Sequence, residues 1–288
     1  MYSTTPANSA AVFTTNKVKA APVLLSQQRI RKSAVAQLVL VNAGNANCAT
    51  GAQGLTTARA TTAAAAKLLN LPADSALVAS TGVIGVPLNP AKITDQLPTL
   101  VRRLHPEGHR SVSRAIMTTD TVPKLASRTV RIGAKTVKLL AMAKGAGMIH
   151  PRMATMLGFF FTDAAVEPKF LRRAVKRMAD LSFNRISVDG DTSTNDTVFL
   201  LANGQARNRL IREGGPGAKE FFAALVDLAQ ELAIRLVRDG EGASKVAEIR
   251  VEGARTEKQA EAIARAIALS PLVKTAIAGA DQIGRAHV

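Results

Sequence analysis

The 288-residue chain has few of the residues that mark secreted, membrane and nucleic-acid-binding proteins. Its one cysteine, Cys48, excludes an internal disulfide framework and a cysteine-based zinc site. It has no tryptophan and one tyrosine, so side chains that stack on bases are scarce. No apolar run reaches the ~18 residues of a membrane helix, and the N-terminus lacks the basic and apolar regions of a secretory signal. We therefore expect a cytoplasmic protein with no membrane partner.

Acidic residues are also scarce, at 21 against 38 basic residues, which gives a net charge of +17. The imbalance lies in residues 1–154, with 19 basic and 4 acidic residues, whereas residues 155–288 have 19 and 17. A basic half is typical of nucleic-acid binding. The basic residues, however, come singly or in pairs, and aromatic side chains are few, with no Trp, one Tyr and nine Phe. We expect no nucleic-acid partner, although a basic binding protein stays open as an alternative.

The four histidines are dispersed and form no arrangement typical of a catalytic triad. No cluster of possible metal ligands accompanies them, so the sequence implies neither a metal nor a redox cofactor.

Stretches typical of strands and of helices alternate along the chain, which predicts a mixed α/β or α+β fold. Pro98 weakens one of the expected helices, over 90–104. The expected strands cover 37–41, 76–80, a hairpin over 128–143, 156–164, 186–191, 197–204 and 245–253. The expected helices cover 55–70, 90–104, 168–183, 216–238 and 256–269.

The most unusual stretch is KGAGMIHPRMATMLGFFFTD, over 144–163. Two glycines follow Lys144, a proline interrupts the chain, and the hydroxyl residue Thr155 stands at the head of an apolar run. A hydroxyl in that position can serve as a nucleophile. The local pattern alone favours an ordinary glycine-rich turn followed by a strand.

The run KGAGMIHPRMATM closely resembles the self-cleavage site of the ornithine acetyltransferase family, also called ArgJ. Four further blocks resemble that family in the same order, so the resemblance extends from about residue 3 to about residue 280. These blocks are FTTNKVKAAPV (13–23), NAGNANCATG (42–51), STGVIG (80–85) and SVDGDTSTNDT (187–197).

The resemblance implies that the chain cuts its own bond between Ala154 and Thr155. Thr155 would then carry a free α-amine, with an ordinary pKa near ~8, as the general base beside its own hydroxyl. An α chain (1–154) and a β chain (155–288) would stay associated and pair into an α2β2 assembly. The implied fold is a layered α/β sandwich of the N-terminal-nucleophile type, with helices covering β-sheets.

The implied reaction moves an acetyl group from N2-acetylornithine to glutamate through acetyl-Thr155, as part of arginine biosynthesis. Acetyl-CoA is a possible second donor, and no other cofactor is implied. Lys144 is expected to pair with a substrate carboxylate and Glu241 with an ammonium, although such charges are more often simply solvated. The implied oxyanion donors are Thr81 and Gly82, and the implied substrate-binding residues are Thr118, Lys144, Thr155 and Glu241.

Both ends of the chain depart from the family pattern. Members begin earlier and continue well beyond the SPLVKTAI block, where an Asn and a Thr complete their substrate site. Residues 283–288 can be encoded by ATC GGA AGA GCA CAC GTC, a string that resembles a sequencing adapter. We expect the coding sequence to run into adapter near Asp281 and the β chain to be truncated. An inactive fragment, or a related self-cleaving amidase or aminopeptidase, are the alternatives.

Overall fold

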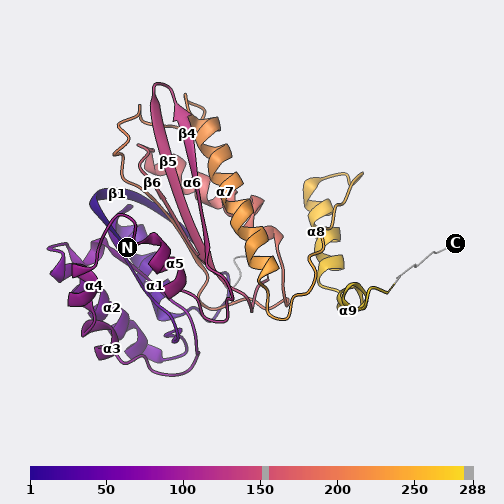
Figure 1. The fold of residues 1–288 in the computed structure, drawn as a ribbon, viewed down its shortest axis with the longest axis horizontal. Helices are drawn as coiled ribbons and strands as arrows, with labels where there is room; N and C mark the ends of the chain where they lie inside the picture. Colours follow the sequence, from indigo (N-terminus) through magenta and orange to yellow (C-terminus); the bar gives the residue numbers. More distant parts are fainter. Residues whose placement is uncertain (151–155, 282–288) are drawn as a thin grey trace.

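The computed structural model describes residues 1–150 and 156–281, and it contains a seven-stranded sheet with helices packed on it (Figure 1). The strands are β1 (Tyr2–Phe13), β2 (Val35–Asn42), β3 (Ala76–Ser80), β4 (Lys124–Ile132), β5 (Lys135–Lys144), β6 (Leu157–Thr162) and β7 (Thr197–Ala202). The helices are α1 (Ala21–Lys32), α2 (Gly51–Leu68), α3 (Ala91–Thr94), α4 (Leu97–Arg102), α5 (His109–Ala115), α6 (Pro168–Leu181), α7 (Ala218–Arg238), α8 (Glu257–Ala268) and α9 (Pro271–Gly279), with short 3-10 helices η1 (Ala73–Ser75) and η2 (Phe183–Arg185).

The strand order is β3-β2-β1-β7-β6-β5-β4. Strand β7 pairs antiparallel with β1 and parallel with β6, and β6 pairs antiparallel with β5. Five strands precede position 155 and two follow it, and β7 lies between β1 and β6. The two halves of the chain therefore share one continuous sheet.

The sheet buries apolar side chains on both of its faces because successive strand residues point to opposite sides. In β6, Phe160 belongs to a core that includes side chains of α6 and α7, whereas Phe159 belongs to a second core with Phe199 of β7. Helices α1 and α2 pack at the β3 end, where Leu25 and Ala58 meet Val78. The expected mixed α/β architecture, with helices covering a sheet, is confirmed.

Several element boundaries differ from expectation. The helix expected over 90–104 is divided into α3 and α4, and Pro98 occupies the first turn of α4. Neither 186–191 nor 245–253 forms a strand. In the first, Asp189 closes a turn by accepting the Asp191 N–H at 3.0 Å. The second has an alternating apolar pattern but no neighbouring strand among the described residues, and its Val246 is 50% exposed.

The N-terminal strand β1 was not expected, although it lies inside the sheet. Its first half is polar and contains Pro6, which cannot donate a ladder hydrogen bond. The β1–β2 register is irregular between Tyr2 and Ala7, and the regular β1–β7 ladder begins at Asn8. Pro6 therefore lies where the ladder does not require its N–H.

No single helix among the described residues has the length and apolar character to cross a membrane; the bent pair α8–α9 passes that test together, on length and composition only. Residues 282–288, which include the tail expected to be adapter-derived, lie outside the described part of the chain.

Candidate active site

Lys144, the last residue of β5, contacts two other side chains expected in the site. Its ammonium donates hydrogen bonds to Thr81 Oγ1 at 3.0 Å and to Thr118 Oγ1 at 2.7 Å. Lys144 is only 3% exposed and Thr81 is buried, whereas Thr118 lies at the surface. Because each threonine oxygen accepts from Lys144, each hydroxyl hydrogen is free to donate to another group.

The ammonium of Lys144 has one N–H left after these two bonds. Asp120 Oδ2 lies 3.9 Å from it, too far for a hydrogen bond but close enough for strong charge attraction. Burial lowers the pKa of Lys144, and the negative charges of Asp120, Asp196 and Glu241 oppose that effect, while Lys124 adds to it. The site therefore contains a buried cation with one donor available to an anionic group.

Gly82 follows Thr81 at the end of β3 and cannot be replaced without strain. Its φ is +129°, and a Cβ there would lie 2.2 Å from the carbonyl carbon of Gly44. Gly82 is exposed, and its N–H has no acceptor among the described residues. The Thr81 hydroxyl and the Gly82 N–H are thus two adjacent donors of the kind that stabilises an oxyanion.

Glu241 lies against the glycine-rich segment that follows β5. Its N–H donates to the carbonyl oxygen of Ala146 at 2.8 Å. A Cβ at Gly147 would come within 2.6 Å of the Glu241 carboxylate, so the missing side chain at Gly147 makes room for it. Glu241 is exposed, so its carboxylate is available at the open edge of the Lys144 site.

Ala154 and Thr155, the expected cleavage pair, lie outside the described residues. Met156, the next residue, donates its N–H to Asp196 Oδ1 at 2.9 Å and accepts the Thr197 N–H at 3.2 Å. Leu157 then pairs with Lys144 across the β5–β6 ladder. The chain therefore enters β6 at the end of the sheet that carries Lys144.

Asp196 is a residue that the sequence reasoning did not single out. It is 1% exposed, and its Oδ2 has no hydrogen-bond partner within the described part of the chain. Burial raises the pKa of Asp196 well above its usual value, against the opposing effects of the Met156 N–H and the Lys144 charge. The feature of the sequence that could have identified Asp196 is its position directly before the apolar strand β7. The neighbouring Asn195 donates to the carbonyl oxygens of Ala46 at 2.7 Å and Ser80 at 2.8 Å, which ties this loop to the end of β3.

Lys124, Asp120 and Asp239 form a second buried cluster, which adjoins the Lys144 site. Lys124 Nζ lies 2.7 Å from Asp120 Oδ1 and 2.5 Å from Asp239 Oδ2. Asp120 Oδ1 also accepts the Gly145 N–H at 2.7 Å. Asp239 accepts the N–H of Thr121 at 3.0 Å. This cluster joins the loop that carries Thr118 to the ends of β5 and α7.

Of the expected site residues, the structure brings Thr81, Thr118 and Lys144 into direct contact. Gly82 directly follows Thr81, and Glu241 contacts Ala146 and Gly147, shortly after Lys144. No group of three or more His, Cys, Asp or Glu that could hold a metal ion occurs within 1–150 and 156–281.

Comparison with known proteins gives consistent matches. The ArgJ family model matches residues 1–286. The arginine biosynthesis bifunctional protein ArgJ of Geobacter sulfurreducens is 50% identical over 276 residues, which are 96% of this chain and 70% of that protein. The crystal structure of the ArgJ protein from Bacillus halodurans is 41% identical with a TM-score of 0.50, over 53% of this chain and 80% of that one. The PH0078 protein of Pyrococcus horikoshii, 12% identical with a TM-score of 0.52 over 82% of this chain and 74% of its own, shares the fold alone.

The family match covers nearly the whole chain, and the identity to a curated member is far above the level at which a fold alone is shared. The family assignment drawn from the sequence blocks is therefore confirmed, as is the acetyltransferase class that it implied. The chain belongs to the ArgJ family of arginine-biosynthesis acetyltransferases.

Proposed function

We propose that this chain transfers an acetyl group from N2-acetylornithine to glutamate through an acetyl ester on Thr155, after cutting itself between Ala154 and Thr155. The observation that carries the proposal is the pair of hydrogen bonds from Lys144 to Thr81 and Thr118, beside the start of β6. These contacts gather donors for an oxyanion at the end of the sheet where the residue after Thr155 begins its pairing.

In self-cleavage, the Thr155 hydroxyl attacks the carbonyl carbon of Ala154. The peptide bond between the Ala154 carbonyl carbon and the Thr155 nitrogen breaks, which leaves an ester on the Thr155 oxygen and a free α-amine on Thr155. Water then hydrolyses the ester, which gives a carboxylate on Ala154 and restores the Thr155 hydroxyl. Residues 1–154 and 155–288 become two chains. The shared sheet supports their lasting association, because β7 pairs with β1 and β6 pairs with β5.

In the transfer reaction, the Thr155 amine takes the hydroxyl proton while the oxygen attacks the acetyl carbonyl of N2-acetylornithine. The oxyanion that forms is stabilised by the Thr81 hydroxyl and the Gly82 N–H. Collapse breaks the acetyl C–N bond, and ornithine leaves with the proton. The amine of glutamate then attacks the ester, and Thr155 oxygen leaves and regains its proton.

Substrate recognition falls to the charged residues at the open edge. The remaining N–H of Lys144 suits a substrate carboxylate, since a charge-assisted bond forms there without disturbing its two threonine partners. Glu241 suits the ornithine side-chain ammonium, because its carboxylate is exposed beside Gly147. Thr118 contributes a surface hydroxyl beside Lys144.

Intact mass after expression tests the cleavage. Two fragments that divide before Thr155 are expected, and Thr155→Ala should give one uncut chain. A cut elsewhere, or the same cut in Thr155→Ala, contradicts the proposal. Incubation with N2-acetylornithine should then add one acetyl mass to the 155–288 fragment, and glutamate should remove it.

The same samples separate the alternatives. Acetate released without N-acetylglutamate would indicate an amidase, and a cleaved chain that never gains the acetyl mass would indicate an inactive fragment. Acetyl-CoA as a second donor is tested by replacing N2-acetylornithine with it. The α2β2 assembly and the cytoplasmic location stay predictions, and native mass after cleavage tests the first.

A further inference from the structure

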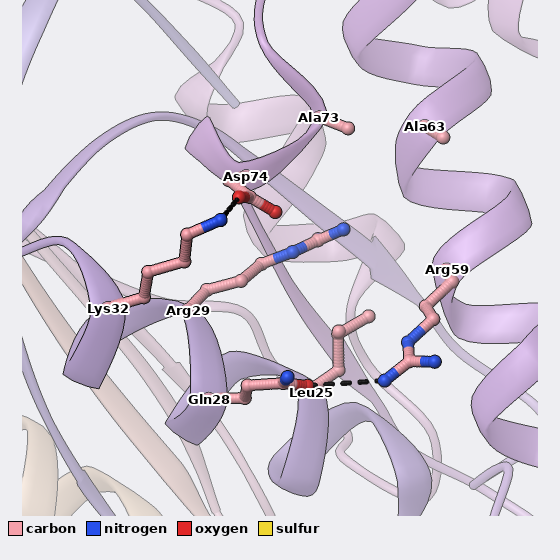
Figure 2. A pocket seen from close by; sticks show the side chains of 8 residues that line it. All are labelled: Leu25, Gln28, Arg29, Lys32, Arg59, Ala63, Ala73 and Asp74. Atoms are coloured by element: carbon pink, nitrogen blue, oxygen red, sulfur yellow. Dashed lines mark hydrogen bonds and ion pairs between the residues drawn. The ribbon is translucent and has the colours of Figure 1, made fainter.

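A cavity of about 340 Å³ lies between α1, α2 and η1, apart from the Lys144 site (Figure 2). Helix α1 lines it with Arg29 and Lys32, α2 with Arg59, and η1 with Asp74. Apolar side chains, Leu25 among them, complete its wall. A pocket of this size accommodates a small metabolite.

Arg29 is the deepest of these charged residues, at 5% exposed. Its Nη1 donates to the carbonyl oxygen of Ala76 at 2.5 Å, which fixes the guanidinium at the start of β3. Among the described residues, its buried Nε has no acceptor and its Nη2 donates no hydrogen bond. A buried guanidinium with unsatisfied donors is costly, because it has given up water without full replacement.

The charges around the cavity do not balance. Asp74 is the one acidic residue in the lining, and it already forms an ion pair with Lys32 at 2.5 Å. Arg59 is exposed and donates only to the neutral Gln28, at 3.3 Å. Burial lowers the pKa of Arg29, the Asp74 charge opposes this, and the Arg59 charge adds to it. Three cations therefore face one carboxylate.

The cavity and the Lys144 site lie at opposite ends of β3. Arg29 bonds to Ala76, the first residue of the strand, whereas Thr81 follows its last residue. Five residue steps of about 3.3 Å separate these ends by roughly 17 Å. A ligand in the cavity would thus not compete with the acetyl-transfer substrates.

We infer that this cavity binds the phosphate monoester group of a small metabolite. Phosphate oxygens match the forked donors of Arg29 from α1 and Arg59 from α2, which both line the cavity. Figure 2 shows Arg59 turned towards Gln28, to which it donates. A phosphate monoester carries about −1.5 to −2 charge at pH 7, close to the local excess of two positive charges. The apolar wall at Leu25 and the cavity volume leave room for an organic group beyond the phosphate.

Titration calorimetry with phenyl phosphate tests the inference, with inorganic phosphate and benzoate as comparison ligands. We expect one phenyl phosphate per chain, weaker binding of inorganic phosphate, and weaker binding of benzoate. Arg59→Gln should reduce the phenyl phosphate affinity about tenfold or more, since a charge-assisted bond is lost. Arg59 is exposed, so this change leaves the core packing intact.

Arg31→Gln is the matched control, because it removes a positive charge from the same helix outside the cavity. Its phenyl phosphate affinity should stay within about twofold of the parent, since exposed charges are screened by salt. Absence of phenyl phosphate binding at millimolar concentration, or equal losses in Arg59→Gln and Arg31→Gln, would overturn the inference. Equal affinity for phenyl phosphate and inorganic phosphate would refute the inference that the ligand carries an organic group. Tighter binding of benzoate than of phenyl phosphate would refute the inference that the bound anion is a phosphate. Each outcome is independent of acetyl transfer.

Discussion

Replacement of Lys124 by methionine removes the charge from the buried cluster that adjoins the candidate site and keeps a side chain of similar length. Lys124 is 1% exposed and contacts Asp120 at 2.7 Å and Asp239 at 2.5 Å. Removing one partner of a buried ion pair costs about 3–5 kcal/mol, because the remaining charge is left without compensation. Two carboxylates would lose their shared partner here, so we expect a loss in that range at pH 7.

The same substitution should change how stability depends on pH. Burial raises the pKa of Asp120 and of Asp239, but hydrogen bonds and nearby positive charges, Lys124 prominent among them, bring both below the ordinary value. In the parent, the stability from these groups is present above the unfolded pKa of ~3.9 and is lost as pH falls through the lower folded values. Without Lys124, burial dominates, both pKa values rise, and the variant recovers stability as pH falls from 7 towards 4.

Urea unfolding at pH 7 and pH 5 measures both effects, once intact mass has established the same processing state in every sample. Lys135→Met is the matched control, because Lys135 is exposed at the turn between β4 and β5. It should cost less than about 0.5 kcal/mol. A loss below about 1 kcal/mol for Lys124→Met, or a difference from the parent that does not shrink at pH 5, would refute this account of the cluster.

Three further predictions concern the site itself. Gly82→Ala should reduce acetyl transfer and destabilise the fold, because its Cβ would lie 2.2 Å from the backbone of Gly44. The control Gly85→Ala, with φ +83° and open space around it, should cost only about 1–2 kcal/mol of stability in thermal unfolding. Equal stability losses in the two variants would contradict the close approach at Gly82. Asp196→Asn should flatten the pH dependence of stability above about pH 4 in urea unfolding, because burial raises the pKa of Asp196 and makes the parent lose stability as pH rises; parallel parent and variant curves would argue against it. Lys144→Met should lower kcat/KM for acetyl transfer about 100-fold or more while the chain stays folded, because two threonine hydroxyls lose their shared donor; an unchanged kcat/KM would remove Lys144 from the mechanism.

The sequence predicted several of the residues that the structure brings together in the candidate site, because they lie within short, recognisable blocks. Thr81 and Gly82 stand together at a strand end, and Lys144 stands at the head of the glycine-rich run. What the blocks could not give was the contact between them. The hydrogen bond from Lys144 to Thr81 joins residues 63 positions apart, and it depends on how two strands end at the same place.

The supporting cluster was missed for a related reason. Lys124 and Asp239 are 115 positions apart, and each alone looks like an ordinary solvated charge. Only the packing of α7 against β4 brings them together and removes the water. The strand expected at 245–253 does not form, although its alternating apolar pattern is typical of a strand. A strand also needs a neighbouring strand to pair with, and the local pattern does not reveal whether one is present.

The position of β7 between β1 and β6 has a consequence for the protein if the proposed cleavage before Thr155 takes place. In the uncut chain, the sheet forms within one molecule, so its assembly does not depend on protein concentration. After the proposed cut, the same hydrogen bonds would join two chains, and unfolding would release two separate chains that must meet again to refold. The midpoint of unfolding should then rise with protein concentration, and refolding from dilute denaturant should be second order. Cleavage would therefore convert a single chain that folds by itself into a two-chain complex whose refolding requires the chains to meet again.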